Sequence, residues 1–264
     1  MLRIAADWKK RQILALFLCL FATSCSAEQP AKEGCLAVEP GALRRHAVEH
    51  VYDGDTLRLR GGDKLRLIGI NTPELGRDGR ADEPLAAEAR AALQSLTAEG
   101  LVWLQAGQDA RDRYGRRLAH AFDRDGRSLS AELLRRGLGF QVLVAPNFAY
   151  ADCFAAQEYL ARESSSGVWS EERFSARSVQ QLREAEGGFV RLRDEITHVS
   201  FKDNGWWVQL GGKVGLRIRA ESQSLFSRAE LRALQGTEVE VRGWLVPMEG
   251  NWWLMNLDHP AMMR

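Results

Sequence analysis

The chain carries almost no net charge and few residues of the kinds that bind transition metals. Its 264 residues include 36 Lys and Arg against 35 Asp and Glu, which leaves a formal charge of +1. This balance excludes a basic DNA-coating protein and an acidic disordered chain, so any contact with nucleic acid must come from a few local groups. With 45% hydrophobic residues, the chain is able to bury a core and is long enough for one large domain or two small ones.

Apolar runs long enough to span a membrane are also missing. The apolar segment 13–22 is too short to cross a bilayer, but it has the size of a signal-peptide core. Basic residues 9–11 precede it and small residues follow it, which is the order found in export signals. We therefore expect residues 1–25 to be a signal peptide rather than a buried helix, and the protein to be periplasmic, secreted or anchored to a membrane as a lipoprotein. Lipid attachment at Cys25 and cleavage after Ala27 are the two alternatives for its processing.

Cysteine is scarce, with four residues in the whole chain. Cys19 lies in the apolar segment and Cys25 at the possible lipid site, which leaves Cys35 and Cys153 in the exported part. Because an exported compartment is oxidising, these two are expected to form a disulfide. Two isolated cysteines 118 positions apart do not make a zinc site, which needs about four clustered Cys or His ligands.

The segment from residue 44 to residue 170, which follows an N-terminal segment at 26–43, predicts mixed strands and helices. Apolar and polar residues alternate as in half-buried strands, and helix start and stop signals flank three apolar-periodic segments. The expected strands are 57–60, 65–67, 101–104 and 118–122, and the expected helices are 82–100, 130–137 and 150–167.

The C-terminal part predicts a second, smaller domain. Residues 171–188 are rich in charge and are expected to be a linker or an exposed connector. After them, residues 189–264 contain five strand-like segments and one helix, which suits a small closed barrel such as an oligonucleotide/oligosaccharide-binding (OB) fold. The segments are 189–192, 206–210, 214–218, 239–245 and 252–257, with the helix near 227–234.

Five of the eight tryptophans lie in this second domain: Trp206, Trp207, Trp244, Trp252 and Trp253. Adjacent tryptophans on one strand must place one ring on each face of the sheet. These tryptophans have two alternative roles, packing in the core and stacking on nucleic-acid bases in a groove.

Three stretches, 51–56, 65–74 and 112–116, concentrate polar groups that packing does not explain. Oxygen ligands without clustered His or Cys favour a hard cation such as Ca²⁺. Asp55, the amide oxygen of Asn71 and a backbone carbonyl near Thr72 would supply ligands to it.

The same stretches contain groups suited to phosphate chemistry. Arg66 and Arg116 carry guanidinium forks that donate two hydrogen bonds at once to phosphate oxygens. Glu74 would orient or deprotonate an attacking water. Taken alone, each stretch also fits an ordinary turn or helix entry, and it is their ordered combination over about 65 residues that favours a site.

Residues 44–170 resemble the staphylococcal nuclease (thermonuclease) family. Five motifs occur in order: Asp53-Gly-Asp-Thr56, Leu65-Arg-Leu-Ile-Gly-Ile-Asn-Thr-Pro-Glu74, Asp112-Arg-Tyr-Gly-Arg116, Leu134-Arg-Arg-Gly-Leu138 and Gly167-Val-Trp169. The resemblance implies an α+β fold with a five-stranded OB-type barrel and three helices, here followed by the second OB-like barrel. It also implies a Ca²⁺-dependent phosphodiesterase acting on DNA and RNA.

Carried over residue by residue, the resemblance assigns a role to each motif. Asp55, Asn71 and the Thr72 carbonyl would hold the calcium ion, with Asp53 outside the direct ligands. Arg66 and Arg116 would stabilise the phosphorane, and Glu74 takes the water-activating position. Arg113 and Tyr114 match positions that contact the terminal phosphate of the substrate.

The sequence departs from the family at two places. The type member has Asp where this chain has Asn71, and the loss of one negative charge should lower calcium affinity without abolishing coordination. In segment 140–146 the type member has base-stacking tyrosines, whereas this chain has Leu143 and no tyrosine. Base preference and affinity are therefore expected to differ.

These features predict an exported, monomeric nuclease that hydrolyses phosphodiester bonds by metal-assisted in-line attack of water. A membrane contact would come only from a lipid at Cys25. One alternative is a non-catalytic nucleic-acid-binding or scaffold protein built from two OB-type barrels. Another is a cell-surface protein that binds oligosaccharide or peptide through its tryptophan-rich part.

Overall fold

The computed structural model describes residues 35–37 and 43–264. The predicted signal peptide, Cys19, Cys25 and most of the N-terminal segment lie outside these residues. The described residues belong to one compact unit that contains both predicted barrels. Within this described part, no helix is long and apolar enough to cross a membrane.

The first barrel is closed by five strands in the order β1-β2-β3-β6-β5. These are β1 (Arg44–Val51), β2 (Thr56–Leu59), β3 (Lys64–Leu67), β5 (Leu101–Arg111) and β6 (Arg117–Phe122). Alternation explains the barrel's core, because Leu57, Leu59, Leu65 and Leu67 point inward and are almost fully buried. Strands β3 and β6 pair in parallel, with Arg66 opposite Leu118.

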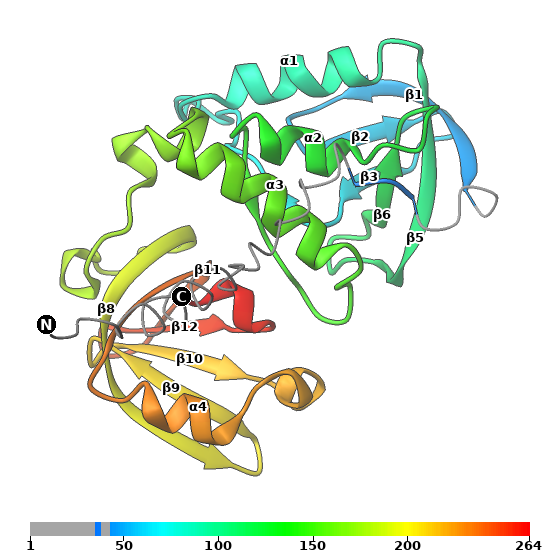
Figure 1. Cartoon of the computed structure of the whole chain (residues 1–264). Coiled ribbons are helices and arrows are strands. Elements are labelled where there is room, and N and C mark those ends of the chain that lie inside the picture. The colour runs from blue at the N-terminus through cyan, green and yellow to red at the C-terminus, as the bar shows by residue number, and fades with distance from the viewer. Residues whose placement is uncertain (1–34, 38–42) are drawn as a thin grey trace, which may run out of the picture. The chain divides into compact units, whose positions relative to one another are not determined.

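Three helices lie beside these strands, α1 (Ala86–Leu96), α2 (Leu129–Arg135) and α3 (Ala151–Glu163) (Figure 1). Helix α1 begins later than predicted because Leu85 has a left-handed backbone, with φ of 67°. Helix α3 ends at Glu163 and is followed by a 3-10 turn at Gly167–Trp169. Gly137, which ends α2, has positive φ, and a Cβ there would lie 2.3 Å from the Ser166 carbonyl oxygen.

The predicted disulfide is present. Cys35 and Cys153 are joined, with their Cα atoms 5.9 Å apart, and the bond ties the segment before β1 to α3. Two further short strands, β4 (Ile70–Asn71) and β7 (Phe140–Gln141), form a separate two-stranded sheet that the sequence did not predict.

The second barrel is also closed by five strands, in the order β10-β12-β11-β8-β9. They are β8 (Gly188–Lys202), β9 (Gly205–Leu210), β10 (Val214–Ile218), β11 (Glu238–Met248) and β12 (Trp252–Asn256), with α4 (Arg228–Ala233) before β11 and 3-10 turns at Ala220–Leu225 and Pro260–Met262. The α+β fold with two small barrels is therefore confirmed. Strand β8 has 15 residues, whereas the predicted segment covered only 189–192. It is long because it pairs with β11 up to Glu195 and with β9 from Ile196 onward.

Residues 171–188 pack more closely than the expected linker. They contain 3-10 turns at Glu172–Phe174 and Val179–Gln181. Val179 is only 1% exposed and belongs to the core of the second barrel, and the Ser178 hydroxyl donates to Asp194 of β8 at 2.8 Å. A few apolar side chains among many charges are enough to hold this segment against β8.

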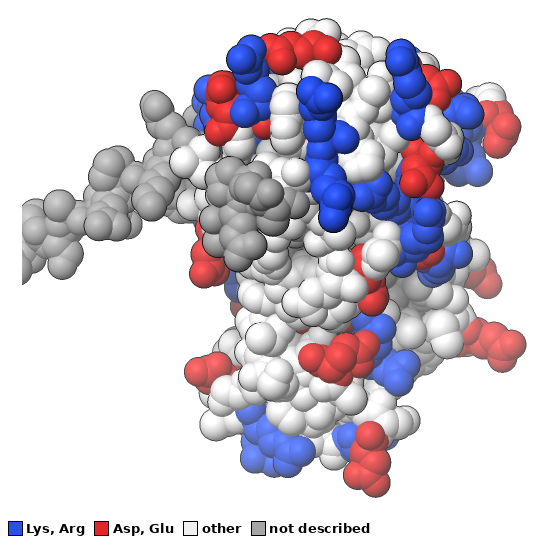
Figure 2. Space-filling view, turned by 90° about the vertical axis from the view of Figure 1, so that its right-hand side faces the viewer, with Lys and Arg blue, Asp and Glu red and all other residues white. Residues whose placement is uncertain are grey.

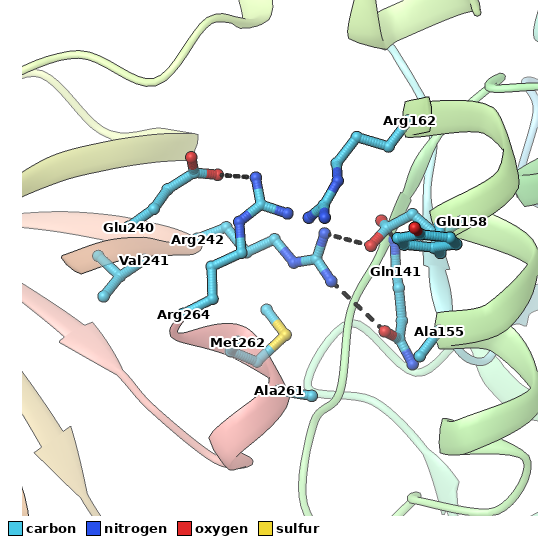
Figure 3. Close-up of a pocket in the computed structure, with 11 residues that line it drawn as sticks. Gln141, Ala155, Glu158, Arg162, Glu240, Val241, Arg242, Ala261, Met262 and Arg264 are labelled. Atoms are coloured by element: carbon cyan, nitrogen blue, oxygen red, sulfur yellow. Dashed lines mark hydrogen bonds and ion pairs between the residues drawn. The ribbon is translucent and has the colours of Figure 1, made fainter. Parts of the chain in front are cut away.

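Contacts between α3 and β11 join the two barrels. Arg242 of β11 donates to the Glu158 carboxylate of α3 at 2.6 Å, and both side chains are more than nine-tenths buried (Figure 3). Val142 and Leu143, which follow β7, are buried in the hydrophobic cluster of the second barrel.

Candidate active site

Asp55 lies at the entrance to β2 and is almost fully buried. Its Oδ2 accepts hydrogen bonds from the Thr72 backbone N–H at 2.9 Å and from the Thr72 hydroxyl at 3.2 Å, and its Oδ1 accepts from Thr56 at 3.0 Å. A buried carboxylate needs such partners to be tolerated in a protein interior. They hold Asp55 in one orientation.

Arg66 is the one residue of β3 that breaks the alternation expected for a half-exposed strand. It is 9% exposed, because its guanidinium turns toward Asp55 and Asn71. Its Nη2 lies 3.0 Å from Asp55 Oδ2 and 3.2 Å from Asn71 Oδ1, and its Nη1 donates to the Leu67 carbonyl at 2.7 Å. Because the charge is paired and the donors are used, the arginine can stay buried.

The oxygen atoms around Arg66 fit a hard cation. Asp55 Oδ2 and Asn71 Oδ1 approach the same nitrogen, so they face one point from β2 and β4. Within the described residues, no three His, Cys, Asp or Glu side chains group as metal ligands. A cation here would therefore depend on one carboxylate, the amide oxygen of Asn71 and backbone oxygen, a set that suits Ca²⁺ better than Zn²⁺.

Two further carboxyl groups surround this point. Burial raises the pKa of Asp53 to about 6, and the neighbouring Asp55 carboxylate acts in the same direction. Glu74 is exposed as a residue, but desolvation of its carboxyl group raises its pKa to about 7, with further contributions from Asp55 and Asp53. Glu74 is thus close to the ionisation range in which a carboxylate accepts protons at neutral pH.

Arg116 ends a turn in which Asp112 Oδ2 accepts from its Nε at 2.7 Å. Arg66 pairs with Leu118 of β6, and Arg116 directly precedes this strand. Among the described residues Arg116 makes no hydrogen bond or ion pair with the Asp55–Arg66–Asn71 group. Arg113 and Tyr114 are exposed at the tip of the turn, where the arginine donates to the tyrosine hydroxyl at 2.7 Å.

The sequence was compared with known proteins. Residues 64–171 match the family described as staphylococcal nuclease homologue. Residues 64–171 are therefore a staphylococcal-nuclease-like region of the chain, which includes three strands of the first barrel and its three helices. The SPbeta prophage-derived endonuclease YokF of Bacillus subtilis is 31% identical over 128 residues, which are 47% of this chain and 43% of that protein. The thermonuclease of Staphylococcus hyicus is 29% identical over 129 residues, covering 47% of this chain and 75% of that protein.

The first barrel thus places residues of the first two motifs together and leaves the third motif on a turn before β6. Sequence reasoning missed Arg77, whose Nη2 lies 3.7 Å from Asp53 Oδ2, and Thr56, which holds Asp55. Thr56 directly follows Asp55 in the first motif, so its contact with Asp55 could have been predicted from the sequence. Arg77 lies in an irregular segment whose path no local pattern predicts.

Leu143, which stands in the segment where the type member has tyrosines, is buried at 3% exposure beside the second barrel. The Leu143 side chain is therefore not exposed to contact a base.

A groove of about 390 Å³ lies on the outer face of the second barrel. Trp206 and Trp253 point into the core, so their neighbours Trp207 and Trp252 face outward and line the groove with Met248. Lys202 and His198 also line it, and none of its lining residues is acidic. Basic and acidic side chains are interspersed over the face shown in Figure 2.

Proposed function

We propose that this chain is a calcium-dependent nuclease that hydrolyses phosphodiester bonds in DNA or RNA. The observation that carries the proposal is that Asp55 and Asn71 both lie within hydrogen-bond distance of the Arg66 guanidinium, in a region that matches the nuclease family. The printed names of the relatives, endonuclease and thermonuclease, support the same activity.

Asp55, the Asn71 amide oxygen and the Thr72 carbonyl oxygen would hold the calcium ion. When bound, the ion would supply positive charge that offsets the charge developing on the phosphate. In the structure Arg66 donates to Asp55 and Asn71, so its guanidinium is positioned beside the cation site and is ready to turn to a phosphate oxygen.

The remaining steps belong to side chains of this chain. Glu74 accepts a proton from a water whose oxygen attacks the phosphorus, the bond to the leaving oxygen breaks in line with the new one, and the released alkoxide takes a proton from solvent. Arg66 and Arg116 donate hydrogen bonds to the equatorial oxygens, which carry more charge in the transition state than in the substrate. Arg113 and Tyr114 would contact a more distant phosphate.

The outer groove of the second barrel suits a single strand. Exposed Trp252 and half-buried Trp207 offer faces for base stacking, and Lys202 offers a cation for the backbone. This groove also favours the second candidate, a non-catalytic nucleic-acid-binding protein. Residues 44–170 and 189–264 are the proposed domains, and we propose that the protein acts as a monomer.

Export is part of the proposal. The Cys35–Cys153 disulfide supports an oxidising compartment, and the basic and apolar residues at the start of the sequence support an export signal. A periplasmic, a secreted and a lipid-anchored protein would each be in an oxidising compartment.

The direct test is cleavage of single-stranded DNA by the purified protein in Ca²⁺ and in EGTA. We expect cleavage in Ca²⁺, its loss in EGTA, and its return when excess Ca²⁺ is added back, because ligand oxygens of this kind bind Ca²⁺ reversibly. Gel analysis of end-labelled DNA measures it. Strand binding without cleavage under every condition would instead support the non-catalytic protein, and glycan binding without nucleic-acid binding would support the third alternative.

A second prediction concerns Asn71. Asn71→Asp restores a second anionic ligand, so the calcium concentration needed for half-maximal rate should fall by about tenfold, since each tenfold change corresponds to about 1.4 kcal/mol of binding. Rates measured over a calcium titration give this value directly. Asn147→Asp, a change of the same kind at a buried asparagine outside the group, is the matched control. An unaltered calcium requirement in Asn71→Asp would show that Asn71 is not a ligand.

A further inference from the structure

A pocket of about 160 Å³ lies between α3 and the β11 side of the second barrel. Three arginines line it: Arg162 from α3, Arg242 from β11 and Arg264. Figure 3 shows their guanidinium groups pointing toward one another across the pocket. The pocket is separate from the Asp55–Arg66–Asn71 group, with which it shares no residue.

The two carboxylates at the pocket wall already accept hydrogen bonds from protein groups. Glu158 accepts from the Gln141 backbone N–H through Oε1 and from Arg242 through Oε2, both at 2.6 Å. Glu240 accepts from Arg264 and also from two arginines behind the wall, Arg191 and Arg193. Together with Arg162, five arginines therefore lie around two carboxylates, and the local charge is positive.

Two of the arginines still have N–H groups that can donate hydrogen bonds to a ligand. Arg162 lies over the Tyr159 ring, 5.7 Å from its centroid, and forms no ion pair with any residue that the structure describes. Arg242 is only 7% exposed, and its Nε is buried without a hydrogen-bond partner in the same part of the chain. Like charges repel more strongly at a partly buried site than in water, so an anion among these groups would remove an unfavourable interaction.

We propose that this pocket binds a phosphate group, at a site separate from the candidate catalytic centre. Guanidinium forks match the tetrahedral oxygens of phosphate, and several of them around one space are a common phosphate-binding arrangement. The pocket of about 160 Å³ leaves room for a phosphate group among the three guanidinium groups. The inference does not depend on nuclease activity.

The position of the pocket suggests why it would matter. Gln141, which lines it, pairs with Ile70 of β4, and the next residue of β4 is Asn71. One strand pair therefore separates the phosphate pocket from the candidate calcium ligands. A nucleic-acid strand or a nucleotide is an available source of phosphate at this place.

Titration of inorganic phosphate into the full chain in EDTA, followed by calorimetry, tests the proposal. Arg162→Gln removes one cation and keeps the Arg242–Glu158 pair, so it should weaken phosphate binding by about tenfold. Arg124→Gln is the matched control, because Arg124 is exposed and its one ion pair among the described residues is with Glu99 at the surface; the phosphate affinity of this variant should stay unchanged. Repeating both titrations in an Arg66→Ala background removes the contribution of the candidate catalytic site, and the Arg162-dependent binding should remain.

Ala155→Glu provides a second, opposite test, because Ala155 lines the pocket and a carboxylate there would take the place of the phosphate. Phosphate binding should be lost while circular dichroism stays that of the folded protein. Equal phosphate affinity in Arg162→Gln and Arg124→Gln, or no phosphate binding by the wild-type chain, would overturn the proposal.

Two further ligands identify the source of the phosphate. Arg162-dependent binding that is stronger for oligothymidylate than for inorganic phosphate assigns the pocket to a strand backbone. Equal binding of inorganic phosphate, adenosine monophosphate and oligothymidylate assigns it to a free phosphate group. Both results support the pocket, and cleavage in Ca²⁺ is measured separately, so failure of the nuclease proposal would not be confused with failure of this one.

Discussion

Replacement of Glu74 by Gln is expected to lower kcat for single-stranded DNA by about two to four orders of magnitude, the range typical of a lost general base. Glutamine keeps the shape of the side chain but cannot accept the proton of the attacking water. Because Glu74 is not among the proposed calcium ligands, the calcium concentration for half-maximal rate should change little. Single-turnover rates at saturating DNA measure the effect on chemistry alone.

The contribution of Glu74 can be separated from a general effect of losing a carboxylate. Glu49→Gln alters an exposed glutamate of β1 that pairs with Arg58 at 3.4 Å, and it should retain full activity. Unchanged kcat in Glu74→Gln would remove Glu74 from the reaction. A loss confined to KM would instead assign it to substrate binding.

The strands and the core of both barrels could be predicted because their signal is local. Alternation at Leu57, Leu59, Leu65 and Leu67 is the same pattern that the folded barrel buries. The turn glycines and the helix stops also act over a few residues. Arg66 could be selected as a candidate site residue for a related reason, since a charged residue between leucines of a buried strand requires a partner elsewhere.

Features that depend on distant partners could not be predicted in the same way. The length of β8 follows from pairing first with β11 and then with β9, and neither partner is visible in the β8 sequence. Burial of Leu143 follows from the presence of a second barrel, so the change from tyrosine could be noted but not explained. The phosphate pocket likewise needs α3 and β11, which are separated by most of the second barrel's sequence.

The candidate site could be predicted in part, because some of its contacts follow from local motifs and others depend on distant partners. Motif order predicted that Asp55, Arg66 and Asn71 belong together, and the structure places Asp55 and Asn71 each in contact with Arg66. Arg116 was assigned to the same group, and the β3–β6 pairing brings the start of β6, which directly follows Arg116, beside Arg66. Its side chain is held by Asp112, a local contact within the turn, so a rotation toward phosphate would exchange one ionic partner for another.

The Arg242–Glu158 pair provides the other large expected effect. Arg242→Met should lower the free energy of unfolding by about 3–5 kcal/mol, because it leaves the Glu158 carboxylate buried without its cation. Both residues are more than nine-tenths buried, so solvent cannot replace the lost partner. Urea unfolding in phosphate-free buffer measures the change, and Arg193→Met, at a half-exposed arginine that also contacts a glutamate, should cost less than about 1 kcal/mol.

The double variant Arg242→Met/Glu158→Gln decides whether the loss arises from the unpaired charge. Glutamine keeps an acceptor for the Gln141 backbone N–H but carries no charge, so the double variant should be more stable than Arg242→Met alone. The reason is that most of the cost in the single variant is desolvation of a charge, which the second substitution removes. Losses that simply add would mean that Arg242 stabilises the junction by packing, and that the ion pair between α3 and β11 contributes little to holding the two barrels together.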